Sequence, residues 1–581
     1  MVTQYNILFN GQQALIKAEK TLKDRSQVDF DKLLPIFLVG DKKAASAAKP
    51  DLEKAISKGN KAIQQHSMMI RGSQKNDFID DSYLLIGKAR YYDQDYLKGL
   101  ETLNYLIQEF PRSEEALEAQ IWAGRTETAL ENFLNAKDRF ENIYREPKLP
   151  NRLKDDAYAA YAELELDQGR NNNAYQLLKQ ALDKTSEKER QVRWTYLAAQ
   201  LQSSLGNDYE ASRLFDEVVS MGPPYEYLFN AQLSRARNID VDLQDPEEAY
   251  QALRKMLKDD KNFDNRDKIY YTMAEIAEKL DNGQRVVHFL NRSIRTSTTN
   301  NKQKGLSYLW LAERNFAVKE YSRAQAYYDS SFQNLPQSHP EYTRVEGLKN
   351  SLDKLVQNLN IITKQDSLQK LAGMDLEQRK KVAEKIIARK KEEEKKKELE
   401  KRRREMDQLA AEGGQSGDDG PSQLGGMGGS DKGFYFYTSG LRSAGVNEFK
   451  QRWGNRKLED HWRRKNKETQ EDAGGGQPTA QNKSGSQAEE EKPPKYQPET
   501  YLKEIPLSDS ALSLSHSKIQ KALLDNGLIY KEEIEDYLAA VQTFEELLER
   551  YPQFEEEARI WYSLFRLHKD NDNPSEAEPY K

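Results

Sequence analysis

The sequence predicts an all-α protein, a right-handed superhelical solenoid of stacked helical hairpins. The first observation is a series of mostly small residues at alternating intervals of 37 and 38 positions, namely Gly99, Ala136, Ala174, Ala211, Ala249, Val286 and Ala324. The second is a bulky apolar residue four positions after each of them, in the order Leu103, Phe140, Leu178, Phe215, Leu253, Leu290 and Tyr328. The third is an upstream series of small residues, Gly87, Gly124, Ala162, Ala199, Ala274 and Ala312. A fixed period of this length indicates two-helix units that bury their apolar faces against their neighbours.

The spacing within one unit has a physical reason. Two helices approach closely where a small residue lies at their crossing, and a bulky residue one turn further fills the adjacent space. The full pattern occurs twice, at Tyr83, Gly87, Tyr96, Gly99, Leu103, Leu106 and Pro111, and at Tyr308, Ala312, Tyr321, Ala324, Tyr328 and Pro336. These positions resemble the tetratricopeptide repeat, although the period exceeds the usual 34 residues. We therefore expect a tetratricopeptide-like array over residues 1–337, which begins with a divergent hairpin of residues 5–22 and 52–65 around a loop that holds Pro35 and Pro50.

A helical extension is expected over residues 338–412. Its first part has apolar residues at steps of three and four, which are Leu348, Leu352, Leu355, Leu359 and Ile362. Its second part, residues 376–412, is highly charged and has Glu four positions before Lys or Arg at Glu392 and Lys396, Glu393 and Lys397, Glu398 and Arg402, and Glu400 and Arg404. We expect this charged helix to stand alone in water.

The composition changes after residue 412. Residues 413–432 form a Gly-rich linker and residues 469–497 a linker rich in Gly, Gln, Ser, Glu and Pro, and both are expected to be flexible. Residues 498–581 return to the repeat pattern with Ala540, Phe544 and Leu547. The sequence stops inside the second helix of a new hairpin, so we expect a longer native product; the alternative is that a partner completes the last unit.

Residues 433–468, between the two linkers, form an aromatic and basic island. Its candidate protein-docking residues are Phe434, Tyr435, Phe436, Tyr437, Phe449, Arg452, Trp453, Arg456, Trp462, Arg463 and Arg464. Four consecutive aromatic side chains favour burial against the array or a partner protein. Interleaved Arg and Trp could also stack on bases, but the net charge of −6 disfavours nucleic acid as a partner.

The arrangement of these parts resembles a more specific family. The matching stretches are YNILFNG at residues 5–11, FYFY at residues 434–437 and RWGNRKLEDHWRR at residues 452–464. They are similar to the PorW/SprE family of tetratricopeptide lipoproteins of Bacteroidota. The resemblance implies a periplasmic, outer-membrane-associated component of the type IX secretion system and of gliding motility, which links the periplasmic ring to the outer-membrane translocon. It also implies a lipid anchor in the full-length form, although this sequence has no signal peptide and no cysteine.

Catalytic, cofactor and metal sites are not expected. The six histidines are isolated, and no His-Glu-x-x-His pair or phosphate-binding loop is present. No apolar run approaches the roughly 20 residues that a transmembrane helix needs. The alternative to a structural adaptor is a peptide receptor or co-chaperone, which requires a cluster of Lys, Asn and Arg on the concave first-helix positions. Those positions hold Leu84, Lys88, Ile121, Arg125, Ala159, Glu163, Leu309 and Glu313, so we favour the adaptor.

Overall fold

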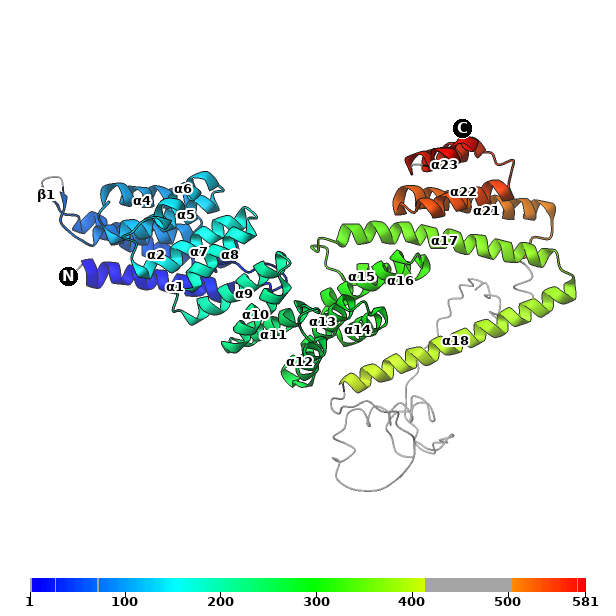
Figure 1. The fold of residues 1–581 in the computed structure, drawn as a ribbon, viewed down its shortest axis with the longest axis horizontal. Helices are drawn as coiled ribbons and strands as arrows, with labels where there is room; N and C mark the ends of the chain where they lie inside the picture. The colour runs from blue at the N-terminus through cyan, green and yellow to red at the C-terminus, as the bar shows by residue number, and fades with distance from the viewer. Residues whose placement is uncertain (1–2, 27, 71–72, 413–503, 572) are drawn as a thin grey trace, which may run out of the picture. The chain divides into compact units, whose positions relative to one another are not determined.

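The chain divides into two compact units, Met1–Leu352 and Asp353–Lys581. The computed structural model describes residues 3–26, 28–70, 73–412, 504–571 and 573–581 (Figure 1). The boundary between the units lies within one long helix, α17 (Tyr342–Ala372), beyond residue 337, where the sequence pattern of the array ends.

The first unit is a succession of helix pairs (Figure 1). Its elements are a π-helical turn (Thr3–Leu8), α1 (Phe9–Arg25), α2 (Lys42–His66), β1 (Met69–Ile70), β2 (Ser73–Gln74), α3 (Ile79–Tyr92), α4 (Tyr96–Glu109), α5 (Glu114–Ala129), α6 (Phe133–Tyr144), α7 (Asn151–Asp167), α8 (Asn171–Leu182), α9 (Lys188–Ser204), α10 (Asp208–Ser220), α11 (Tyr225–Arg237), α12 (Pro246–Lys258), a 3₁₀ turn (Asp260–Asn265), α13 (Arg266–Lys279), α14 (Gly283–Thr296), α15 (Asn301–Ala317) and α16 (Tyr321–Asn334). Each α-helix from α1 to α15 packs against the next along the chain. The prediction of an all-α solenoid is confirmed.

Small residues lie at the helix crossings, as the spacing predicts. A Cβ atom added to Gly87 would lie 2.5 Å from Cδ2 of Leu103, and one added to Gly124 would lie 2.6 Å from Cζ of Phe140. Ala249 is an exception, because it is only half-buried while the adjacent Tyr250 is buried.

The turn inside each pair also repeats. A residue with φ between +51° and +78° stands in six of these turns, at Gln94, Glu131, Gly169, Gly206, Asp281 and Lys319. The next backbone N–H bonds back across the turn, for example from Asp95 to the carbonyl of Arg90 at 2.9 Å, which satisfies a free carbonyl at the helix end. The connection between α11 and α12, residues 238–245, has no such left-handed residue, and a pocket of about 300 Å³ lies between α10, α11 and α12.

The first hairpin corrects one prediction. Pro35 lies in the connection between α1 and α2, but Pro50 lies inside α2 rather than in a loop. A proline inside a helix costs about 3 kcal/mol. Ala48 and Leu52 on either side of Pro50 are fully buried, and the packing of this apolar face offsets the cost.

The second unit combines the later part of α17 with the C-terminal helices. These are α18 (Leu376–Glu412), α21 (Asp509–Ile529), a π-helical turn (Tyr530–Ile534), α22 (Tyr537–Arg550), α23 (Glu557–Asp570), α24 (Pro574–Ala577) and a 3₁₀ turn (Glu578–Tyr580). Gln369 of α17 donates to Ser515 of α21 at 2.9 Å, and Arg550 of α22 pairs with Asp366 of α17. The predicted repeat residues of α22 are fully buried, namely Ala540, Phe544 and Leu547.

The charged helix α18 confirms one expected ion pair and corrects one expectation. Glu398 and Arg402 form one of the predicted ion pairs, with 2.9 Å between nitrogen and oxygen. We had expected α18 to be surrounded by water. Ile387 is buried, however, so one side of this helix is covered.

Candidate protein-binding face

The first helices of successive pairs, α3, α5, α7, α9, α11, α13 and α15, form one face of the array, here called the first-helix face. Direct contacts join α3 with α5, α5 with α7, α11 with α13, and α13 with α15. Residues 28–37, which belong to the connection between α1 and α2, contact side chains of α5, α9, α11 and α15 on this face. We call these residues the strap.

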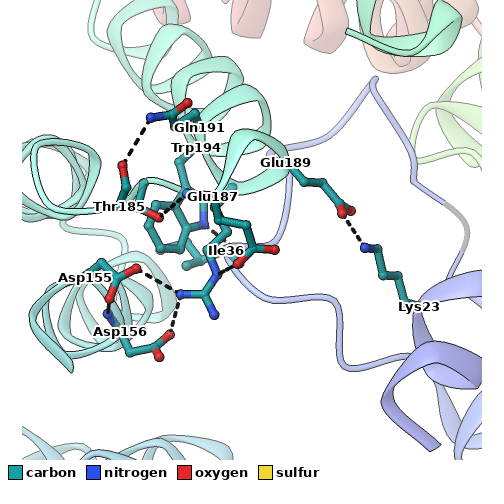
Figure 2. A network of polar contacts seen from close by, with 10 residues as sticks. Lys23, Ile36, Asp155, Asp156, Thr185, Glu187, Glu189, Gln191 and Trp194 are labelled. Carbon is teal, nitrogen blue, oxygen red and sulfur yellow. Dashed lines mark hydrogen bonds and ion pairs between the residues drawn. The ribbon is translucent and has the colours of Figure 1, made fainter. Parts of the chain in front are cut away.

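Two side chains of α9 bind the backbone of the strap. The indole Nε1 of Trp194 donates to the carbonyl of Ile36 at 3.0 Å (Figure 2). The side-chain amide of Gln200 accepts from the backbone N–H of Leu34 at 2.9 Å and donates to the carbonyl of Lys32 at 2.7 Å. Because these bonds are made to backbone groups, they hold the chain without reading its side chains.

Aromatic and apolar contacts hold the strap side chains. Leu34 and Ile36 are each 1% exposed. The ring of Phe37 lies 3.8 Å from the guanidinium carbon of Arg125, within the range of a cation–π interaction. The ring of Phe30 lies edge-on to Tyr196 and Tyr227, with centroids 5.3 and 5.0 Å apart.

Ion pairs connect neighbouring first helices. The nitrogen–oxygen distances are 3.7 Å for Arg125 of α5 and Glu163 of α7, 2.8 Å for Arg190 of α9 and Asp156 of α7, and 2.8 Å for Arg237 of α11 and Glu275 of α13. Figure 2 shows the second of these bridges beside Trp194, with Lys23 of α1 pairing with Glu189 of α9 nearby. The bridges fix the spacing of the helices on which the strap lies.

Burial shifts the pKa values of titratable groups on this face. It raises the pKa of Glu163 to about 7, against the opposing effect of Arg125. For Asp31 of the strap, burial also acts upwards, but the hydrogen bond and charge of Lys302 prevail and the pKa lies below its ordinary value. Arg193 of α9 is 9% exposed, burial lowers its pKa, and its Nε has no hydrogen-bond partner among the described residues.

The cations at the positions of a carboxylate clamp already have partners. Lys88 pairs with Glu118, and Arg125 pairs with Glu163. This agrees with our rejection of a clamp of that type from the sequence.

The predicted docking residues lie outside the described residues, and their role stays a prediction; they are Phe434, Tyr435, Phe436, Tyr437, Phe449, Arg452, Trp453, Arg456, Trp462, Arg463 and Arg464. Sequence reasoning missed the strap. The available signal was the group of apolar residues in a connecting segment, Phe30, Leu34, Ile36 and Phe37. The described part of the chain has no group of three or more potential metal ligands and no helix long and apolar enough to cross a membrane.

The fold and this face define an all-α solenoid of tetratricopeptide-like helix pairs. No protein-family model matches the chain, and no curated protein matches it. Among solved structures, a chain in the crystal structure of the APC/C hetero-tetramer Cut9-Hcn1 is similar at 11% sequence identity and a TM-score of 0.26, with 93% of this chain and 84% of that chain covered.

Proposed function

We propose that the chain is a non-enzymatic scaffold that binds other proteins. The observation that carries this proposal is the strap, an irregular polypeptide segment held on the first-helix face. Trp194 and Gln200 bind its backbone, and Tyr196 and Tyr227 bind its Phe30 side chain. Aromatic pockets together with backbone hydrogen bonds are typical of surfaces that recognise peptides.

Within this class, we propose an adaptor of the type IX secretion machine. Support comes from the resemblance of residues 5–11, 434–437 and 452–464 to the PorW/SprE family. The proposal places the protein in the periplasm, attached to the outer membrane by a lipid in its full-length form. Its partners would be the periplasmic ring and the outer-membrane translocon.

The test is affinity purification from the native cell of wild type and of a Trp453→Ala, Trp462→Ala double variant. Aromatic anchors commonly carry most of the binding energy of an interface. We expect the double variant to lose the secretion components and secretion itself while its melting temperature stays unchanged. A matched control removes two exposed aromatic side chains of the array, Tyr144→Ala with Tyr209→Ala, and should retain both activities.

An Arg463→Ala, Arg464→Ala variant tests the basic rim of the same segment. We expect it to weaken co-purification less than the tryptophan variant does. Normal secretion in both variants would contradict docking through residues 433–468.

A peptide receptor or co-chaperone is the second candidate, and the strap-binding face favours it too. The same purification separates the two functions. Recovery of cytosolic chaperones without secretion components would favour the function of a peptide receptor over that of a secretion adaptor.

A further inference from the structure

We propose that the place on the first-helix face where Phe30 and Asp31 lie is an exchangeable site for a partner protein. The occupant is a turn-forming segment with an aromatic residue followed by Asp or Glu, as in the strap, where the backbone N–H of Lys32 donates to the carbonyl of Asp29 at 3.2 Å. The strap is its internal competitor. This inference rests on the proposed scaffold function and names the chemistry of one partner segment.

The two ends of the strap are held differently. Leu34 and Ile36 are almost fully buried, and the backbone of Ile36 bonds to Trp194, so this end is a permanent part of the core. Phe30 is only half-buried and Asp31 is exposed. The second end can therefore leave the face without opening the core.

The ion pair at the exchangeable end is open to solvent. The side chains of Lys302 and Asp31 are 40% and 59% exposed, and an exposed pair contributes little to stability. A carboxylate from another chain can replace Asp31 at small cost.

Three cations lie near Asp31 at this end, and one of them, Arg237, is already paired with Glu275. Besides Lys302, the cations Lys268 and Arg237 lie close enough to Asp31 to lower its pKa. A partner segment therefore gains from an acidic residue at this place.

Arg193 provides an independent observation. It is nine-tenths buried, its Nε has no hydrogen-bond partner among the described residues, and its charge acts on Tyr227, one of the two rings around Phe30. A buried guanidinium nitrogen without a partner is unfavourable, and a second acidic group of a ligand would satisfy it.

The aromatic part of the site is preformed. Tyr196 is buried, its ring also packs edge-on against Phe215 at 5.1 Å, and its hydroxyl lies 3.4 Å from that of Ser234. These contacts do not involve the strap, so the ring keeps its position when Phe30 leaves.

Tethering determines how strongly the strap competes. A short flexible tether gives an effective concentration on the order of 1 mM. If the strap end binds its site with an intrinsic Kd of about 100 μM, a free peptide competes with it and binds wild type roughly tenfold more weakly than a protein with a vacant site.

The experiment measures fluorescence anisotropy of a labelled peptide, Val-Asp-Phe-Asp-Lys-Leu, with the full chain. The vacated protein carries Phe30→Ala and Asp31→Ala, and retains the buried Leu34 and Ile36. We expect it to bind the peptide about tenfold more tightly than wild type. On the vacated background, Lys302→Glu should weaken binding at least fivefold.

The matched control for charge is Arg213→Gln on the same background, because Arg213 pairs with Glu210 within α10 rather than with the strap. It should leave the affinity unchanged. Circular dichroism melting of every variant separates a lost site from a lost fold.

Equal affinity for wild type and the vacated protein would overturn the proposal, as would unchanged binding of a peptide with Lys at the place of Asp31. A dimer detected by light scattering would indicate that two copies exchange their straps. The occupant of the site would then be a second copy of this chain and not a partner protein. If the peptide fails to bind but the tryptophan variants of residues 433–468 still lose the secretion components, only this inference fails and the scaffold function stands.

Discussion

Glu131 illustrates a residue whose backbone conformation opposes its side chain. It is exposed, with φ of +59°, in a turn where Gly169 occupies the equivalent place one repeat later. A left-handed conformation costs a residue with a side chain roughly 1–2 kcal/mol. Part of the gain from glycine is lost to its greater freedom in the unfolded chain. We predict that Glu131→Gly stabilises the array by about 0.5 kcal/mol in urea unfolding.

Gly169→Ala is the reverse change. A Cβ atom at this position meets nothing within 4 Å, so only the backbone conformation opposes it. We expect a loss of about 1 kcal/mol. If Glu131→Gly and Gly169→Ala changed the free energy of unfolding in the same direction, the left-handed backbone conformation would not explain their effects.

Asp81 makes stability depend on pH. Burial, followed by the charges of Glu115, Asp80 and Glu118, raises its pKa from 3.8 to about 6. The folded state therefore binds this proton more tightly than the unfolded state does, so the contribution of Asp81 is lost as pH rises through 6. Relative to Asp81→Asn, wild type should gain about 1 kcal/mol between pH 7.5 and 5, with solvent screening allowed for. Denaturant titrations of both proteins at the two pH values check this, and parallel pH profiles would contradict it.

At the scale of the element, the helix crossings explain why the pairs could be predicted. A small residue and the bulky residue that fills its gap lie within one hairpin, as Gly124 and Phe140 do. Such a contact leaves a regular trace in the sequence. Ala249 departs from this regularity in the pair joined by the long connection 238–245, where the apolar face of α12 is carried by Tyr250 and Leu253.

The strap could not be found by the same reasoning. The bond from Trp194 to Ile36 joins residues 158 positions apart, and the ion pair of Lys302 with Asp31 joins residues 271 positions apart. A contact made once, across several repeats, produces no periodic signal. The composition of residues 28–37 marks them as apolar but does not identify what covers them.

Ala174 tests the crossings directly. It is fully buried in α8, and Ala174→Leu adds bulk to a filled space. Overpacking of this kind typically costs about 1–3 kcal/mol, so the melting temperature should fall. Asn172→Leu, at an exposed position of the same helix, is the matched control and should change little. An unchanged melting temperature of the Ala174 variant would mean that the periodic small residues do not mark crossings.

At the scale of the whole molecule, the sequence predicts the regular parts better than their association. The repeat signal at Ala540, Phe544 and Leu547 predicts their burial. It does not predict that α21 and α22 contact the later part of α17. The contacts that join them are polar side-chain interactions that do not recur from repeat to repeat. The bond between Gln369 and Ser515 spans 146 positions, and the bond between Arg550 and Asp366 spans 184.

The tie of Arg550 to Asp366 gives the last prediction. Both side chains are about two-thirds buried, at 29% and 30% exposure, and two guanidinium nitrogens bond to the two carboxylate oxygens. A bidentate pair of this kind is stronger than an exposed one. We expect Arg550→Ala to raise amide hydrogen exchange severalfold in α21, α22 and residues 353–372, while α3 to α10 exchange as in wild type. Arg566→Ala removes an exposed arginine that pairs within α23 and should leave all these regions unchanged. Faster exchange across both units in the Arg550 variant would show that the tie does not act within Asp353–Lys581 alone.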